Sequence, residues 1–212
     1  MSAMAARIFS DFLPTLLAGM VVNFQIAALA LLLGMVLGLL LAAARVYGGV
    51  AGVLATSLIA LMRAAPTFVV MFFLLNAIPR DASLLGVPLA VGGIMAVVLS
   101  LVPYSAAYAA DAGVEALQEM RAGSTLGALL FLPNMTRAFF VLVMSSSAGA
   151  AVGVSEGIAV ILRHAGQLPA LSDRLVLFAF GVLCFGIPLQ LGFALIRLAQ
   201  RRLGRRLTGT RS

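Results

Sequence analysis

Residues 12 to 44 read FLPTLLAGMVVNFQIAALALLLGMVLGLLLAAA and contain no Asp, Glu, Lys, Arg or His. Two further stretches, residues 82 to 110 and 175 to 196, are free of these residues in the same way. A hydrocarbon core about 30 Å thick is crossed by roughly 20 helical residues, so each stretch is long enough to span a bilayer. We therefore expect the chain to lie in a membrane.

The composition of the whole chain agrees with this expectation. Of the 212 residues, 63% are hydrophobic and 10% are charged, and the mean hydropathy is +1.14. Only helices and closed barrels satisfy every backbone group in lipid, and these runs are too long and too evenly apolar for barrel strands. The sequence predicts an all-α, polytopic membrane helix bundle, with residues 1 to 212 forming one transmembrane domain and no cleaved signal peptide.

The apolar runs and the arginines together predict the topology. With five spans, the termini lie on opposite sides of the membrane. The C-terminus is expected in the cytoplasm, because six of the fourteen basic residues, all Arg, crowd residues 197 to 212. This tail is also expected to contact anionic lipid, and nucleic acid is not an expected partner. The predicted spans are residues 14 to 43, 51 to 78, 88 to 110, 133 to 153 and 175 to 198, with Arg45, Arg121 and Arg137 inside and Arg7, Arg80, Arg163 and Arg174 outside.

Residues for catalysis or for a bound metal are scarce. The chain has no Lys and therefore no phosphate-binding Gly-x-x-x-x-Gly-Lys loop. Ser155, His164 and Asp173 lie in a polar hairpin without a nucleophile elbow, and the lone Cys184 is interpreted as a packing residue. The sequence predicts no enzymatic activity, no catalytic residue, no metal site and no cofactor.

Arg63 is the most conspicuous polar residue within a predicted span. A charged side chain at the centre of a membrane helix costs about 2.5 to 3.5 kcal/mol on insertion scales. Pro66, three residues later, removes a backbone donor and is expected to kink or break the helix. The pair either opens a broken helix to a polar cavity, or Arg63 reaches toward the cytoplasmic headgroups; the sequence leaves both open.

Two tyrosines and a serine run are the other candidates for a polar path. Tyr104 and Tyr108 lie four residues apart on one helix face, where they either line the path or are buried with one hydrogen bond each. Ser145, Ser146 and Ser147 follow in the fourth predicted span, and Asn23, Gln25 and Asn76 add uncharged polar groups. Glycine pairs such as Gly34 and Gly38 predict close helix packing, within or between subunits.

Three stretches resemble one family of membrane proteins. They are residues 12 to 45, residues 61 to 79 (LMRAAPTFVVMFFLLNAIP) and residues 132 to 157 (LPNMTRAFFVLVMSSSAGAAVGVSEG). The second resembles the family's Arg-Gly-Thr-Pro segment with its Leu/Phe-rich continuation. The chain is similar to the permease subunits of bacterial ABC importers for polar amino acids of the histidine, arginine, glutamine and opine type.

The resemblance implies a division of labour in a bacterial inner membrane. A periplasmic protein would deliver the solute, two membrane subunits, identical or related, would form the path, and cytoplasmic ATPases would drive transport. Which solute is carried is not readable from the residues. Together, the resemblance and the polar residues predict which residues line or shape the solute path. These are Arg63, Pro66, Tyr104, Tyr108 and Ser145 to Ser147.

The family's coupling loop, which docks on the ATPase between the third and fourth spans, is abbreviated here. Its signature is matched loosely by residues 115 to 117, Gly123 and residues 132 to 133, and the family's Lys-Asp-Thr-Ser reads Met144-Ser145-Ser146-Ser147. Residues 111 to 122 are predicted to form a stub helix with Asp111, Glu115 and Glu119 on one face, either docking or solvated. Glu115, Glu119, Arg121 and Gly123 are the predicted ATPase contacts.

An alternative interpretation gives the shortened loop more weight. The chain would then be a degenerate permease-like scaffold, or a partner subunit without coupled transport of its own. A secondary carrier working alone is disfavoured, because five spans do not divide into equal inverted repeats and no internal repeat is visible.

Overall fold

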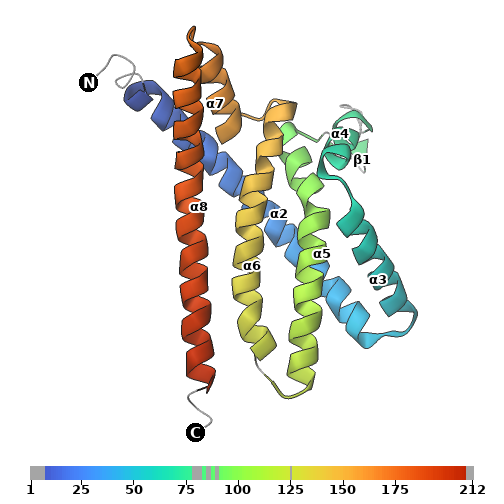
Figure 1. The fold of residues 1–212 in the computed structure, drawn as a ribbon. Helices are drawn as coiled ribbons and strands as arrows, with labels where there is room; N and C mark the ends of the chain where they lie inside the picture. The colour runs from blue at the N-terminus through green and yellow to red at the C-terminus, as the bar shows by residue number, and fades with distance from the viewer. Residues whose placement is uncertain (1–7, 78–82, 85–86, 89–90, 125, 209–212) are drawn as a thin grey trace. The chain divides into compact units, whose positions relative to one another are not determined.

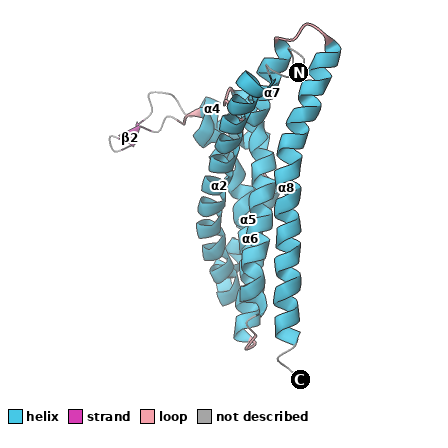
Figure 2. Cartoon of the chain, turned by 90° about the vertical axis from the view of Figure 1, so that its left-hand side faces the viewer, coloured by secondary structure: helices cyan, strands magenta, loops and turns pink. Residues whose placement is uncertain are grey.

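The computed structural model describes residues 8–77, 83–84, 87–88, 91–124 and 126–208. Helices account for nearly all of the described chain, as Figures 1 and 2 show. Between α4 and α5 lie two paired two-residue strands. In chain order the elements are a π-helical turn η1 (Ile8–Phe12), α2 (Leu13–Tyr47), α3 (Gly49–Ala64), α4 (Thr67–Ala77), β1 (Ser83–Leu84), β2 (Val87–Pro88), α5 (Gly93–Arg121), α6 (Leu126–Ser145), the 3₁₀ helix η2 (Ser146–Val152), α7 (Gly157–Gly166) and α8 (Leu171–Thr208).

Four helical segments of the described chain are long and apolar enough to cross a membrane. A fifth is counted if the broken pair α3 and α4 forms a single span. The predicted all-α, polytopic membrane helix bundle is thereby confirmed, whereas the side of the membrane that each terminus faces stays a prediction. The four segments are Ser10–Tyr47, Gly93–Arg121, Phe131–Val152 and Leu171–Leu198.

The second predicted span, residues 51 to 78, is not continuous. α3 ends at Ala64 and α4 begins at Thr67, with Ala65 and Pro66 between them. The proline ring disfavours a helical conformation in the preceding residue, and Ala65 is extended, with φ −68° and ψ 117°. The helix break expected at Pro66 is confirmed, so the predicted span of residues 51 to 78 is built from two helices.

The third span is longer than predicted, and the separate helix expected after it is absent. Residues 111 to 121 continue α5 and do not form a separate stub helix. Alanine, the best helix former, recurs along this segment, and like charges four residues apart cost only a few tenths of a kcal/mol. The helix ends where Gly123 takes φ +81°, with Ser124 N donating to Glu119 O and Gly123 N to Met120 O. This is a Schellman motif, which glycine closes without strain.

The last third of the chain contains one helix that the sequence did not predict. α7 lies within the stretch interpreted as a polar hairpin. The fourth predicted span, residues 133 to 153, combines most of α6 with η2. α8 extends to Thr208, so the arginine-rich segment begins as a continuation of the last helix.

Contacts divide the chain into two compact units, each built from parts of several helices. The first unit comprises Met1–Leu29, Pro66–Leu101 and Val143–Ile187. Its core joins the start of α2 to α7 and α8, and Gly19 faces the start of α7, where a Cβ would lie 3.0 Å from the backbone of Glu156 and Gly157. The residues of this core are Phe12, Leu16, Met20, Val160, Ile161, Ala165 and Leu177.

The second unit comprises Ala30–Ala65, Val102–Leu142 and Pro188–Ser212. Here α2 and α5 approach closely through small residues. A Cβ on Gly34 would lie 1.8 Å from Ser105 Oγ, and one on Gly38 would lie 2.5 Å from Ala106 O. Such small-xxx-small spacing lets membrane helices pack backbone to backbone, and in this protein the pair packs within the chain.

Candidate functional site

A polar stripe runs along α5 in the second unit. Its members are Tyr104, Tyr108, Asp111, Glu115 and Gln118, and each is exposed or half-buried. They are spaced i, i+4, i+7, i+11 and i+14, which places them on one helical face. At about 1.5 Å per residue the stripe is about 21 Å long, a large part of the bilayer's hydrocarbon thickness.

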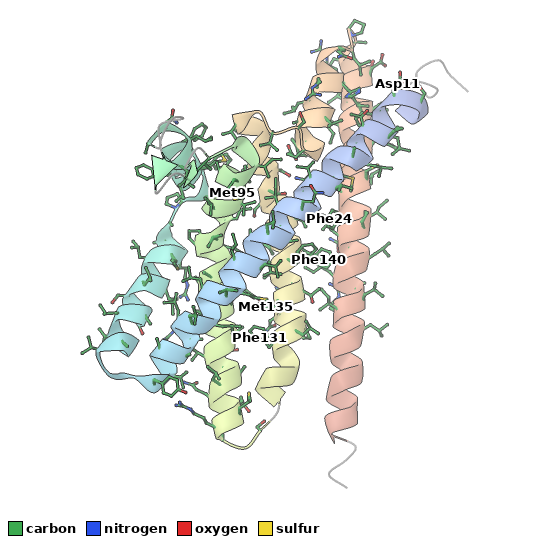
Figure 3. All side chains as sticks on the ribbon, turned by 180° about the vertical axis from the view of Figure 1, so that it is seen from behind. Asp11, Phe24, Met95, Phe131, Met135 and Phe140 are labelled. Atoms are coloured by element: carbon green, nitrogen blue, oxygen red, sulfur yellow. The ribbon has the colours of Figure 1, made fainter. Side chains whose placement is uncertain are left out.

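The other faces of α5 explain why the stripe is turned outward from the unit's core. They carry small residues that are buried against neighbouring helices. Ala107 and Ala110 pack with Ile59 of α3, while Ala109 and Ala112 pack with Met135 of α6. Figure 3 shows Met135 and Phe131 on α6; Met135 belongs to this cluster, and Phe131 and Tyr108 pack against it.

An ion cluster forms at the middle of the stripe. The Asp111 carboxylate accepts a hydrogen bond from Arg63 Nη2, at the last turn of α3. It also pairs with Arg45 Nη1 at 3.5 Å, from the last turn of α2. Three helices of the second unit therefore meet at one carboxylate, and the cluster holds two guanidinium groups against one acidic group.

The two tyrosines lie above the ion cluster on the same face of α5. Their ring centroids are 6.3 Å apart and their planes are inclined by 30°, a stacked arrangement. The phenols therefore extend the polar surface toward the start of the helix.

The charged side chains of the ion cluster are too exposed to face the hydrocarbon of the bilayer. The side chains of Arg45, Arg63 and Asp111 are 39%, 61% and 41% exposed within the chain. Charges in a membrane helix turn toward the bundle interior or a water-filled cavity, because hydrocarbon does not solvate them. Among the residues whose side chains are described, the stripe is well suited to face water, a partner subunit or a polar solute.

The structure brings together part of the predicted path. Arg63, Tyr104 and Tyr108 lie in the second unit, close to Asp111 or on its helix face. Pro66 and the serine run, Ser145 to Ser147, belong to the first unit, so their place in a path stays a prediction. Two residues of this site were not predicted from the sequence: Arg45, the second cation at Asp111, and Gln118, a member of the stripe. For Gln118, the helical spacing from Tyr104 along α5 was the available signal.

The predicted ATPase contacts fall on different surfaces of the second unit. Glu115 lies on the stripe, and Glu119 is exposed one turn later. Arg121 points back to the α2–α3 turn, where it donates to Val46 O at 3.1 Å and covers the Tyr47 ring at 5.2 Å. Gly123 ends the helix, as described above.

A second polar cluster, in the first unit, was also missed by the sequence argument. Glu156 is fully buried and caps α7: its Oε2 accepts from Ile158 N, and its Oε1 accepts from Ala159 N, both at 2.9 Å. Asn23 Nδ2 donates to Glu156 Oε2 at 2.9 Å and to Ser146 Oγ at 2.8 Å, while Asn23 Oδ1 accepts from Gly157 N. Ser146 in turn donates to Val143 O.

This closed cluster has the properties of a structural cap. Its donors and acceptors are matched to one another, which removes the cost of burying them. An acidic residue at the start of the apolar run of α7 is typical of a helix N-terminus, and this was the available signal. Within the part of the chain that the structure describes, no three His, Cys, Asp or Glu side chains gather as a metal site.

Comparisons with known proteins give one informative match. No protein-family model matches the chain, and no curated protein does. A solved structure, "Crystal structure of an amino acid ABC transporter with histidines", is similar with a TM-score of 0.72 over 95% of this chain and 99% of that chain. At 16% sequence identity the match shows a shared fold.

Proposed function

We propose that this chain is the membrane-spanning permease subunit of an ABC importer that moves a polar amino acid or a similar small solute. The observation that carries the proposal is the polar stripe of α5, a charged and phenolic surface on a helix long and apolar enough to cross a membrane. The fold shared with a chain of an amino acid ABC transporter supports it. The resemblance of residues 12 to 45 and 61 to 79 to such permeases points the same way.

The proposal assigns the chain no chemical step of its own. Without a Lys the chain lacks the phosphate loop of an ATPase, so ATP would be hydrolysed by a cytoplasmic partner subunit. A periplasmic solute-binding protein would deliver the solute, and a second permease subunit, identical or related, would complete the path in a bacterial inner membrane. The stripe of each subunit would face the shared path, where water and solute satisfy its charges.

Coupling to the ATPase would use the C-terminal end of α5. Glu115 and Glu119 present carboxylates one turn apart near this end, and both are exposed. Arg121 and Gly123 hold the end in place, through the contact with Tyr47 and through the Schellman turn. A basic groove on the partner would complement the two carboxylates.

Reconstitution tests the proposal directly. The chain is co-expressed with a candidate ABC ATPase and a candidate solute-binding protein, and the purified set is placed in proteoliposomes. We expect ATP-dependent uptake of at least one of the twenty common amino acids, supplied with the binding protein. A complex that assembles and hydrolyses ATP but accumulates no amino acid contradicts the proposal.

The short connection between α5 and α6, residues 122 to 125, favours one competing function, a scaffold subunit without coupled transport. Replacing Glu115 and Glu119 together by Arg separates the two. If these carboxylates dock on the ATPase, uptake and ATPase retention are both lost; for a scaffold, neither changes. Asp173→Arg, a charge reversal in the first turn of α8, is the matched control.

A further inference from the structure

The ion cluster at Asp111 contains more cation than anion. Arg45 and Arg63 together carry a charge of +2 against −1 on Asp111, which leaves +1 on a partly exposed surface between three membrane helices. An isolated surface ion pair would carry no such excess. The next carboxylate of the stripe, Glu115, is exposed one turn along α5 and forms no ion pair with Arg45 or Arg63. An anion from outside the chain can therefore take the surplus charge that hydrocarbon would not solvate.

The hydrogen-bond count gives the same result. A guanidinium has several N–H donors in a fixed planar fork. Arg63 uses Nη2 for Asp111, and Arg45 approaches Asp111 only at 3.5 Å. Among residues 10–77, 91–124 and 131–198, whose side chains are described, no other acceptor is found for either group. Most donors of the Arg63 fork are therefore available, and its side chain is 61% exposed.

The chemistry of the available donors selects the ligand. A planar fork matches a carboxylate with two parallel hydrogen bonds. A lipid phosphate also matches it, but Arg63 lies fourteen residues after the start of α3 at Gly49, which is about 21 Å of helix. That distance separates the Arg63 backbone from the α2–α3 turn, the end of α3 at which headgroups are expected. Its guanidinium reaches toward Asp111, which Arg45 approaches from the last turn of α2, so the binding test below includes a lipid phosphate as a competing ligand.

We propose that Arg63, assisted by Arg45, is a carboxylate-binding subsite of the stripe, and that Asp111 is the resident anion that an incoming carboxylate competes with. This proposal rests on the proposed function. It specifies that the chain recognises the carboxylate of the solute. Binding of a small solute with a carboxylate involves no proton transfer and no covalent bond. The carboxylate accepts hydrogen bonds from the Arg63 fork, with the Tyr104 and Tyr108 phenols further along the same face.

The proposal predicts that removing the charge of Asp111 strengthens carboxylate binding. If Asp111 competes for the guanidiniums, Asp111→Asn frees both of them and carboxylate binding becomes tighter by several fold. If Asp111 instead only clamps α3 in place, the same substitution weakens or abolishes binding. Arg63→Gln removes the fork and is expected to weaken binding at least tenfold, whereas Arg63→Lys keeps the charge and part of the affinity.

The binding experiment uses the protein purified with the subunits that it retains, in nanodiscs of zwitterionic phosphatidylcholine. The thermal unfolding midpoint is recorded with each of the twenty common amino acids, and each that raises it is compared with its decarboxylated amine, for example histidine with histamine or arginine with agmatine. We expect the amino acid to raise the midpoint and the amine not to. Arg163→Gln in α7, whose only described hydrogen bond is to exposed Ser155, is the matched control and should bind as the wild type does.

Each contrary outcome has a distinct meaning. The subsite is overturned if an amino acid and its amine raise the unfolding midpoint equally, or if no amino acid raises it. A midpoint raised by phosphatidylglycerol nanodiscs in the wild type and not in Arg63→Gln assigns the cluster to a lipid phosphate, which also overturns it. The double variant Arg63→Gln with Asp111→Asn, which leaves no unpaired charge on Asp111, shows whether lost binding reflects lost folding. Uptake is measured separately, so binding without ATP-driven uptake contradicts only the proposed function.

Discussion

The polar clusters of the two units differ in how completely their hydrogen bonds are satisfied. Around Asn23, Ser146 and Glu156 in the first unit, the groups are fully buried and matched to one another. Around Arg63 and Asp111 in the second unit, the groups are partly exposed and carry a net positive charge. Both clusters contain a carboxylate and join helices far apart in sequence, so composition alone does not separate them.

The difference indicates which polar residues hold the structure and which are available for binding. A closed cluster gains nothing from a ligand, because its donors and acceptors are already used. In an open cluster within a membrane segment, the charges keep a free-energy cost of poor solvation, which a ligand or water can remove. The expected consequence is that changes in the first cluster reduce stability, whereas changes in the stripe reduce transport.

The largest effect is expected for Glu156→Ala. The substitution removes the acceptor for two backbone amides of α7 and for Asn23 Nδ2. Loss of a cap together with unsatisfied buried donors corresponds to about 3 kcal/mol or more of unfolding free energy. The measurement is the unfolding midpoint and the yield of monodisperse protein in detergent.

Glu119→Ala is the control for this change, because Glu119 is exposed and no side-chain contact is described for it. It should leave the midpoint unchanged. A Glu156→Ala protein as stable as this control would show that the closed cluster does not stabilise the first unit.

A smaller loss of stability, about 2 kcal/mol, is expected for Gly34→Leu. The added side chain would collide with Ser105, whose hydroxyl donates to Ala30 O at 2.7 Å. This change sharpens the comparison, because it tests whether the second unit is held by close packing where the first is held by a polar cluster. The measurement is again the unfolding midpoint. Val36→Leu, at a position of α2 that is 64% exposed, adds bulk without a collision and should unfold as the wild type does.

The smallest effect is expected for Tyr104→Phe. It removes one hydroxyl from the stripe and keeps the ring stacked on Tyr108. Uptake in proteoliposomes should fall by up to about tenfold, equivalent to about 1.4 kcal/mol, with an unchanged unfolding midpoint. Tyr47→Phe, which keeps the ring beneath Arg121, should leave uptake unchanged. A stability loss in Tyr104→Phe without an uptake defect would place this phenol with the structural groups.

The success of the sequence prediction varied with the range of the interactions involved. The spans and the break at Pro66 depend on apolar length and on local backbone chemistry, and the structure confirms both. The stub helix over residues 111 to 122 was wrong, because the resemblance to the coupling loop separated these residues from the third span. Helix propensity and burial of the alanine faces instead continue α5 to Arg121. Glu156 was overlooked because its importance depends on Asn23, more than a hundred residues away.

The sequence alone determined that this is a helical membrane protein, because a run of some twenty apolar residues has no other stable place for its side chains and backbone. It also placed a cation before a broken helix and two phenols one turn apart. Only the tertiary structure decided which polar groups are closed off and which remain open. That outcome depends on which faces of α5 pack against α2, α3 and α6, and packing of small residues against distant neighbours is not encoded in any local pattern.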